Sequence, residues 1–144
     1  MSARTLLAFD YGRQRIGIAV GQEITHSSTP LTTVHAINHK PDWDKISKLI
    51  QEWQPDALVV GIPLQMDGKE QEMSKAARKF SRQLEGRYRL PIFEADERLS
   101  SREAQQQIKL GRQSGTRGRS QKGDVDKIAA SVILQRWLDG QVTL

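Results

Sequence analysis

Short apolar runs alternate with helical patterns along this chain, and the alternation leaves few possible folds. Residues 6–9 and 16–21 are apolar or β-branched runs separated by a turn that contains Gly12, which predicts a hairpin of two strands. Later runs at 57–61 and 91–95 each follow a segment whose apolar residues recur every three to four positions. A hairpin followed by alternating helices and strands predicts an α/β layer fold with a mixed sheet.

Local signals set the expected boundaries of these elements. Pro30 restricts the run 28–34 to an edge strand, because proline cannot donate a hydrogen bond to a neighbouring strand. The run 57–61 is apolar throughout, as is typical of a strand that is buried on both faces. Helices are expected over about 42–54, 70–85, 100–111 and 124–138, with boundary signals at Asp42, Pro55, Gly86, Ser100 and Asp124.

The periodicity also predicts which helix faces pack inward. In the first helix these residues are Trp43, Ile46, Leu49, Ile50 and Trp53. In the second helix they are Met73, Ala76, Ala77, Phe80 and Leu84. In the last helix the face that contains Asp126 also carries Ala129, Ala130, Ile133 and Trp137.

Composition excludes several classes of protein. The chain has 144 residues, of which 37% are hydrophobic and 27% charged, so we expect one globular domain over residues 1–144. It has no cysteine, which excludes disulfides, thiolate zinc sites and cysteine nucleophiles. No apolar run approaches the length of a membrane span and no signal-peptide pattern precedes the first strand, so a cytoplasmic protein without membrane contact is expected.

Positive charge is concentrated in two places. The formal net charge is +5, and residues 111–122 contain three glycines, four positive charges, no acid and no apolar residue. We expect this segment to be a flexible loop that contacts nucleic-acid phosphates through Arg112, Arg117, Arg119 and Lys122. Arg98, next to Glu97, is a further candidate for a phosphate contact, or it orients the acid. The second group is one face of the second helix, which is either a phosphate-binding surface or only a solvated one: Lys75, Arg78, Lys79 and Arg82.

Three acidic residues from distant parts of the chain are candidates for one metal site. Asp10 and Glu97 follow apolar strands, and Asp126 lies near the start of the last helix on its packed face. Carboxylates that converge from strand ends and a helix are the ligands that Mg²⁺ or Mn²⁺ requires. Divalent ions held in this way are common catalysts of phosphodiester hydrolysis.

Each acid also has a plain structural explanation. Asp10 could cap the turn that follows it, Glu97 could pair with Arg98, and Asp126 could serve the helix dipole together with Asp124. Strand alternation places Glu97 and Asp96 on opposite faces, so only one of them can readily point toward Asp10. The combination of the three acids therefore carries more weight than any one of them.

The sequence resembles the YqgF family, also called RuvX, over about residues 4–140. Four motifs in the same order carry the resemblance: residues 8–12 with 15–19, residues 60–64 with 66–68, residues 96–100, and residues 125–130. The resemblance implies an RNase H-like fold with a mixed five-stranded sheet flanked by helices, related to RuvC resolvases. It implies a nuclease that processes the 5′ end of pre-16S ribosomal RNA in ribosome biogenesis, with Asp10, Glu97 and Asp126 as catalytic metal ligands.

Other functions remain open at this point. The relationship to RuvC suggests a DNA endonuclease that resolves Holliday junctions, which would normally act as a homodimer rather than a monomer. A non-catalytic RNA-binding factor of ribosome assembly would keep the basic surface without cutting RNA. The segment from Asp10 to Gly17 also resembles the phosphate loop of actin-like sugar kinases, but that fold needs two such domains and this chain is too short. In RuvC-type sites a fourth acid lies on the last helix, and the candidate here is Asp124.

Overall fold

The structure is a computed structural model that describes residues 4–38, 40–63, 72–96 and 122–140. The strands are β1 (Thr5–Asp10), β2 (Arg15–Gln22), β3 (Ser27–His35), β4 (Ala57–Ile62) and β5 (Ile92–Asp96). They form a sheet of order β3-β2-β1-β4-β5, in which β1, β2 and β3 are antiparallel neighbours while β1, β4 and β5 are parallel. The expected mixed five-stranded sheet is therefore confirmed.

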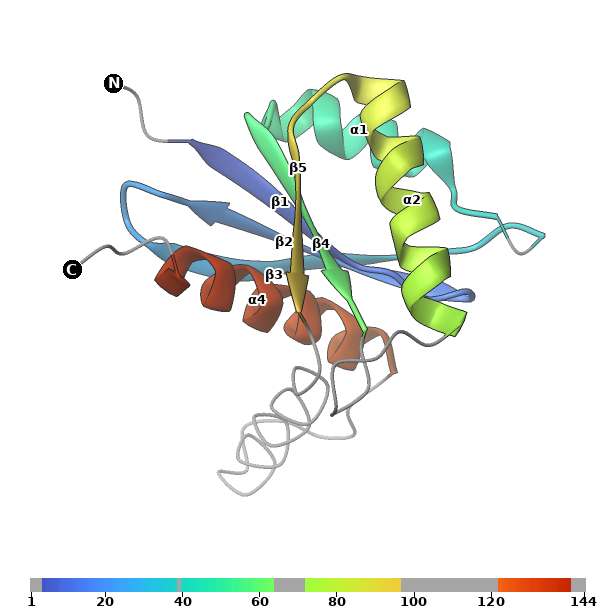
Figure 1. Ribbon diagram of the computed structural model, residues 1–144. Helices are drawn as coiled ribbons and strands as arrows, with labels where there is room; N and C mark the ends of the chain where they lie inside the picture. The colour runs from blue at the N-terminus through green and yellow to red at the C-terminus, as the bar shows by residue number, and fades with distance from the viewer. Residues whose placement is uncertain (1–3, 39, 64–71, 97–121, 141–144) are drawn as a thin grey trace.

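The described helices cover both faces of this sheet. They are α1 (Trp43–Trp53), α2 (Glu72–Tyr88) and α4 (Lys122–Gly140). Figure 1 shows α1 and α2 on one face and α4 along the other. The sheet is thus the middle layer between helices, which gives β1 and β4 their burial on both sides.

The core consists of two clusters, one on each face of the sheet. Leu7 and Phe9 of β1 point toward α1 and α2, where Phe80 is buried against them. Leu6 and Ala8 point the other way and pack with residues of α4. The alternation along β1 therefore decides which helix each side chain meets, and it continues to the end of the strand at Asp10.

The first helix and the edge strand agree with the sequence predictions. Asp42 caps α1, and its side chain accepts a hydrogen bond from the backbone N–H of Lys45 at 3.3 Å. The helix ends at Trp53, and its C-cap Gln54 adopts a left-handed conformation just before Pro55. β3 is an edge strand, and its pairing with β2 shifts register next to Pro30.

Two details of α2 differ from the prediction. Gly86 does not cap the helix, which continues to Tyr88, and the left-handed residue after its end is Arg89. The buried positions include Ser74 and Ser81, whereas Met73 and Ala76 are only partly buried. Serine is small enough to be buried on the packed face of the helix. A prediction that counts only apolar residues therefore does not include every residue of that face.

The start of α4 also differs from the prediction. The helix begins at Lys122, so Asp124 lies within its first turn and is not the N-cap. Lys122 consequently belongs to the helix and not to the predicted loop. The predicted third helix at 100–111 and the rest of the loop lie outside the described residues. Within the described part of the chain, no helix has the length and apolar character to cross a membrane.

Candidate metal centre

Asp10 is the last residue of β1 and lies on the face of the sheet that α4 covers. It follows Leu6 and Ala8 in the row of alternating side chains that packs with α4. In the antiparallel ladder Asp10 is paired with Gly17 of β2. Directly opposite residues of such a pair point to the same face, so Asp10 shares its face of the sheet with Gly17.

Helix α4 comes very close to the sheet at Gly17. A Cβ atom built on Gly17 would overlap the backbone carbonyl of Asp126. Only glycine allows the first turns of α4 to come so near to β2 at this position. Because Asp10 is the partner of Gly17 in the ladder, this contact brings the backbones of Asp10 and Asp126 into the same small region.

The packed face of α4 agrees with the prediction from helical spacing. Ala129, Ala130 and Ile133 are buried and Trp137 is half-buried. Asp126 precedes them on this face, and its side chain keeps 21% of its surface exposed. Its carboxylate is therefore at the boundary between the packed layer and solvent, where an ion could reach it.

Arg15 forms an ion pair with Asp126 that the sequence patterns did not predict. The Arg15 Nε donates to Oδ2 of Asp126 at 2.6 Å, and the two side chains are 28% and 21% exposed. Arg15 is the first residue of β2, and it precedes Gly17 by two positions. The two partners are 111 residues apart in sequence, so no local pattern predicts this ion pair. The one sequence signal for a role of Arg15 is its position in the motif 15–19 that resembles RuvX.

Glu97 lies outside the described residues, but the strand that leads to it is described. Phe93 and Ala95 of β5 pack with the cluster on the α4 face, whereas Glu94 points to the other face and pairs with Arg78 of α2. This confirms the predicted alternation from Phe93 to Ala95. The described ranges contain no group of three potential metal-binding side chains.

Asp10 and Asp126 fit a hard divalent cation. Both supply carboxylate oxygens, which Mg²⁺ and Mn²⁺ prefer, and Mg²⁺ commonly binds one or two protein carboxylates with water completing its shell. Both are at the end of the sheet where the parallel strands β1, β4 and β5 have their carboxyl ends. Loops that leave this edge supply ligand-binding residues in many α/β folds.

The predicted nucleic-acid contacts are described only in part. Arg98, Arg112, Arg117 and Arg119 lie outside the described residues. Lys122 is the first residue of α4, one helical turn before Asp126, so its backbone is at the same end of the helix as the candidate ligand.

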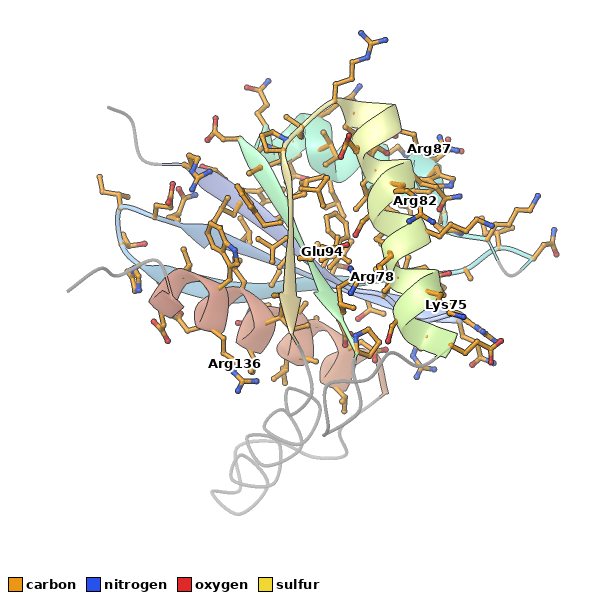
Figure 2. The ribbon with its side chains drawn as sticks, in the orientation of Figure 1. Lys75, Arg78, Arg82, Arg87, Glu94 and Arg136 are labelled. Carbon is orange, nitrogen blue, oxygen red and sulfur yellow. The ribbon has the colours of Figure 1, made fainter. Side chains whose placement is uncertain are left out.

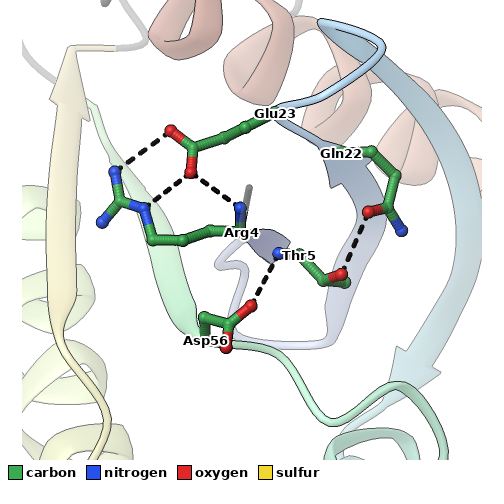
Figure 3. A network of polar contacts seen from close by, with 5 residues as sticks. All are labelled: Arg4, Thr5, Gln22, Glu23 and Asp56. Carbon is green, nitrogen blue, oxygen red and sulfur yellow. Dashed lines mark hydrogen bonds and ion pairs between the residues drawn. The ribbon is translucent and has the colours of Figure 1, made fainter. Parts of the chain in front are cut away.

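A polar network ties the opposite end of β1 to its neighbours (Figure 3). Arg4 donates from Nε to Oε1 of Glu23 at 2.7 Å and from Nη2 to Oε2 of Glu23 at 3.2 Å. The hydrogen bond from Arg4 holds the pKa of Glu23 below its ordinary value. Nearby, the Thr5 backbone N–H donates to Asp56 at 2.8 Å, and the Thr5 hydroxyl donates to Gln22 at 3.0 Å.

Sequence comparisons identify relatives along almost the whole chain. The family model described as "RuvX: Holliday junction resolvase" matches residues 4–140. A protein from Nitrosococcus oceani with the name "Putative pre-16S rRNA nuclease" is 49% identical over 141 residues, which cover 98% of this chain and 90% of that protein. A protein of the same name from Pseudomonas putida is 51% identical over 136 residues, which cover 94% of this chain and 95% of that protein.

Solved structures with the same fold include RuvC. The structure of T. thermophilus RuvC in complex with Holliday junction substrate matches with a TM-score of 0.52, covering 95% of this chain and 94% of that one. The Thermus thermophilus RuvC structure matches with a TM-score of 0.50. Both are 11% identical in sequence, so the likeness establishes the RNase H-like fold of RuvC and no more.

Proposed function

This chain belongs to the RuvX family, and on that premise we propose that it is a metal-dependent nuclease that processes the 5′ end of pre-16S ribosomal RNA. The names of its relatives in Nitrosococcus oceani and Pseudomonas putida support this substrate. The reaction is hydrolysis of a phosphodiester bond. Water attacks the phosphorus atom, and the bond to the 3′ oxygen breaks, which leaves a 3′-hydroxyl and a 5′-phosphate.

The observation that carries the proposal is the approach of α4 to the sheet at Gly17. It brings Asp126 to the same face and the same edge of the sheet as Asp10. The ion pair with Arg15 already gives Asp126 one partner at this edge. A shared cation would in addition use the carboxylates of Asp10 and Asp126 together, which capping of their own elements would not do.

Asp10, Glu97 and Asp126 are the residues that would hold Mg²⁺ or Mn²⁺. When bound, such an ion lowers the pKa of a water molecule and stabilises the charge that develops on the phosphate. The role of Asp10 and Asp126 is to supply carboxylate oxygens from two rigid elements, a strand end and a helix. Arg15 holds the Asp126 carboxylate in one orientation through its bond to Oδ2.

The basic residues of the proposal bind the substrate and do no chemistry. The phosphates that flank the cleaved bond would be contacted by Arg98, Arg112, Arg117, Arg119 and Lys122. Such contacts do not depend on the base sequence, and they weaken as the salt concentration rises. A substrate of ribosomal origin places the protein in the bacterial cytoplasm. One copy of this edge of the sheet can cut one strand, so a monomer is sufficient for the ribosomal substrate.

The test is cleavage of a 5′-extended pre-16S RNA by the wild type and by Asp10→Asn, in Mg²⁺, Mn²⁺ or EDTA. The expected result is cleavage with either metal, none in EDTA, and a loss of at least about 100-fold in Asp10→Asn. Retained circular dichroism and retained RNA binding by Asp10→Asn would separate loss of chemistry from loss of fold. RNA binding without cleavage by either protein would instead indicate a non-catalytic assembly factor.

A four-way DNA junction is the second substrate in the same assay. The description of the matching family model, a Holliday junction resolvase, favours this alternative. Preferential, metal-dependent cleavage of the junction by a dimer would replace the ribosomal role with junction resolution, because paired cuts require two symmetric active sites.

A further inference from the structure

Helix α2 carries a row of exposed basic side chains that the proposed metal centre does not use. Lys75, Lys79 and Arg82 are exposed and Arg78 is partly exposed. Figure 2 shows Lys75, Arg78 and Arg82 following one another along α2, with Arg78 turned toward Glu94 of β5. We call Lys75, Arg78, Lys79 and Arg82 the α2 basic face.

The α2 basic face starts beside the edge of the sheet that holds Asp10. Arg13, in the turn after Asp10, pairs with Glu72 at the first turn of α2 at 3.1 Å. In Figure 1 the first turns of α2 lie near the carboxyl end of β4, and the helix then runs away from that end. The basic residues therefore extend outward from the proposed site of cleavage.

Three of these four cations form no ion pair with the residues that the structure describes. Arg78 pairs with Glu94 of β5 at 2.7 Å, and Arg87, farther along the helix, lies over the ring of Trp43 at 4.1 Å. In the part of the chain that the structure describes, no ion pair involves Lys75, Lys79 or Arg82. Arg87 therefore packs on Trp43. Lys75, Lys79 and Arg82 have no such contact among those described.

The spacing of the four cations makes the helix less stable. Lys75 lies three and four positions before Arg78 and Lys79, and Arg82 lies four and three positions after them. Like charges at these spacings repel one another on a helix surface and weaken the helix. Lys75 is also in the first turn, where the helix dipole favours an acid. A polyanion bound to this face would remove the repulsion.

We propose that the α2 basic face binds the sugar–phosphate backbone of the RNA on one side of the cleaved bond. The inference rests on the proposed nuclease function and adds a second, rigid contact surface to the predicted loop at 111–122. The face supplies ammonium and guanidinium donors and no exposed aromatic ring, since Trp43 is covered by Arg87. Contacts of this kind bind phosphates and do not read the base sequence.

The test compares two triple variants with equal loss of charge. The first is Lys75→Gln with Lys79→Gln and Arg82→Gln, and glutamine keeps the helix propensity of the residues that it replaces. The matched control neutralises three exposed lysines around α1, which are Lys40, Lys45 and Lys48. Binding of a labelled single-stranded RNA is measured by fluorescence anisotropy in EDTA, so that no RNA is cut, over a series of salt concentrations.

The expected result is specific to the first variant. The affinity at 0.1 M salt falls by roughly 10- to 100-fold, and the slope of log K against log salt becomes shallower by about 2, as for the loss of three phosphate contacts. The control keeps a slope close to that of the wild type. Equal effects of both variants would overturn the inference, because they would show only a response to net charge.

The outcome for the α2 basic face is independent of the outcome for the nuclease. An unchanged slope in the first variant, together with metal-dependent cleavage by the wild type, would overturn RNA binding by the α2 basic face and support the proposed function. A shallower slope without any cleavage would support RNA binding by this face and overturn the proposed nuclease activity. Urea unfolding of both variants checks that neither change has altered the fold.

Discussion

Arg15 and Asp126 form an ion pair of 2.6 Å that joins the start of β2 to the start of α4. The pair is partly buried, and it lies beside Gly17, where the helix touches the sheet. Arg15 uses Nε to contact one carboxylate oxygen, Oδ2, so a metal ion and Arg15 can share the two oxygens of Asp126. The arginine therefore stabilises the carboxylate before any cation arrives and fixes its orientation.

A double-mutant cycle measures this relationship. Arg15→Ala and Asp126→Ala should each destabilise the fold, and the double variant should lose about 1 kcal/mol less than the sum, because the second change removes no remaining bond. Urea unfolding in EDTA provides the free energies without a contribution from metal. Strictly additive losses would show that the ion pair contributes nothing to stability. A cycle on the exposed pair Arg13–Glu72 is the control, with a smaller expected coupling.

Gly17→Ala should separate α4 from the sheet. The new methyl group would overlap the backbone carbonyl of Asp126, which cannot move without the helix, so we expect a loss of about 1–3 kcal/mol in the free energy of unfolding. Metal-dependent cleavage should fall as well, because Asp126 moves away from Asp10.

Gly86→Ala is the matched control for this change. Gly86 lies within α2, and a Cβ there meets no atom within 4 Å. The substitution should stabilise the protein by about 0.5–1 kcal/mol through helix propensity. If Gly17→Ala were as harmless as Gly86→Ala, the close approach of α4 to β2 would be wrong.

Two buried serines of α2 should respond in opposite ways to alanine. The Ser74 hydroxyl donates to the backbone carbonyl of Pro63, whereas the buried Ser81 hydroxyl has no hydrogen-bond partner among the described residues. Ser74→Ala should therefore be less stable than Ser81→Ala by about 1–2 kcal/mol. Both substitutions gain helix propensity, so their difference reports mainly the polar contacts that the Ser74 hydroxyl loses. Equal stabilities in thermal unfolding would contradict the assignment.

The ion pair between Arg4 and Glu23 should make stability depend on pH at the acidic end. Arg4 lowers the pKa of Glu23 in the folded state, so the pair contributes fully above the unfolded pKa of about 4.3. The contribution disappears as the pH falls through the lower, folded pKa. Glu23→Gln should therefore be less stable than the wild type at pH 7, by about 1 kcal/mol, with a smaller difference at pH 3. Urea unfolding at both pH values measures this, and a constant difference would exclude the linkage.

Much of the fold follows from patterns that are local in sequence. The apolar runs located the described strands to within one or two residues, and Pro30 correctly indicated the edge position of β3. The errors occurred where a local signal had two meanings. Glycine often ends a helix, but Gly86 lies inside α2, and Asp124 has the residue type of a cap but lies in the first turn of α4.

The candidate site was predictable in its acids and not in their neighbours. Asp10 was recognisable because it follows an apolar strand, and Asp126 because it lies on the apolar face of the last helix. The ion pair of Arg15 with Asp126 and the contact at Gly17 depend on how α4 packs on the sheet. Arg15 and Asp126 are 111 residues apart, and local periodicity does not predict contacts at that separation. The assignment of Asp10, Glu97 and Asp126 as metal ligands remains a prediction, and Glu97 lies beyond the described end of β5.

The order of the strands has a consequence for how the chain reaches its native state. β1, β2 and β3 are consecutive in sequence and pair as neighbours, so this meander can form with little loss of loop entropy. The contact of α4 with β2 closes a far longer loop, so we expect it to form late in folding. Competence to bind a metal at Asp10 and Asp126 would then arise only in the final folding step, and a folding intermediate with an intact meander would be catalytically silent.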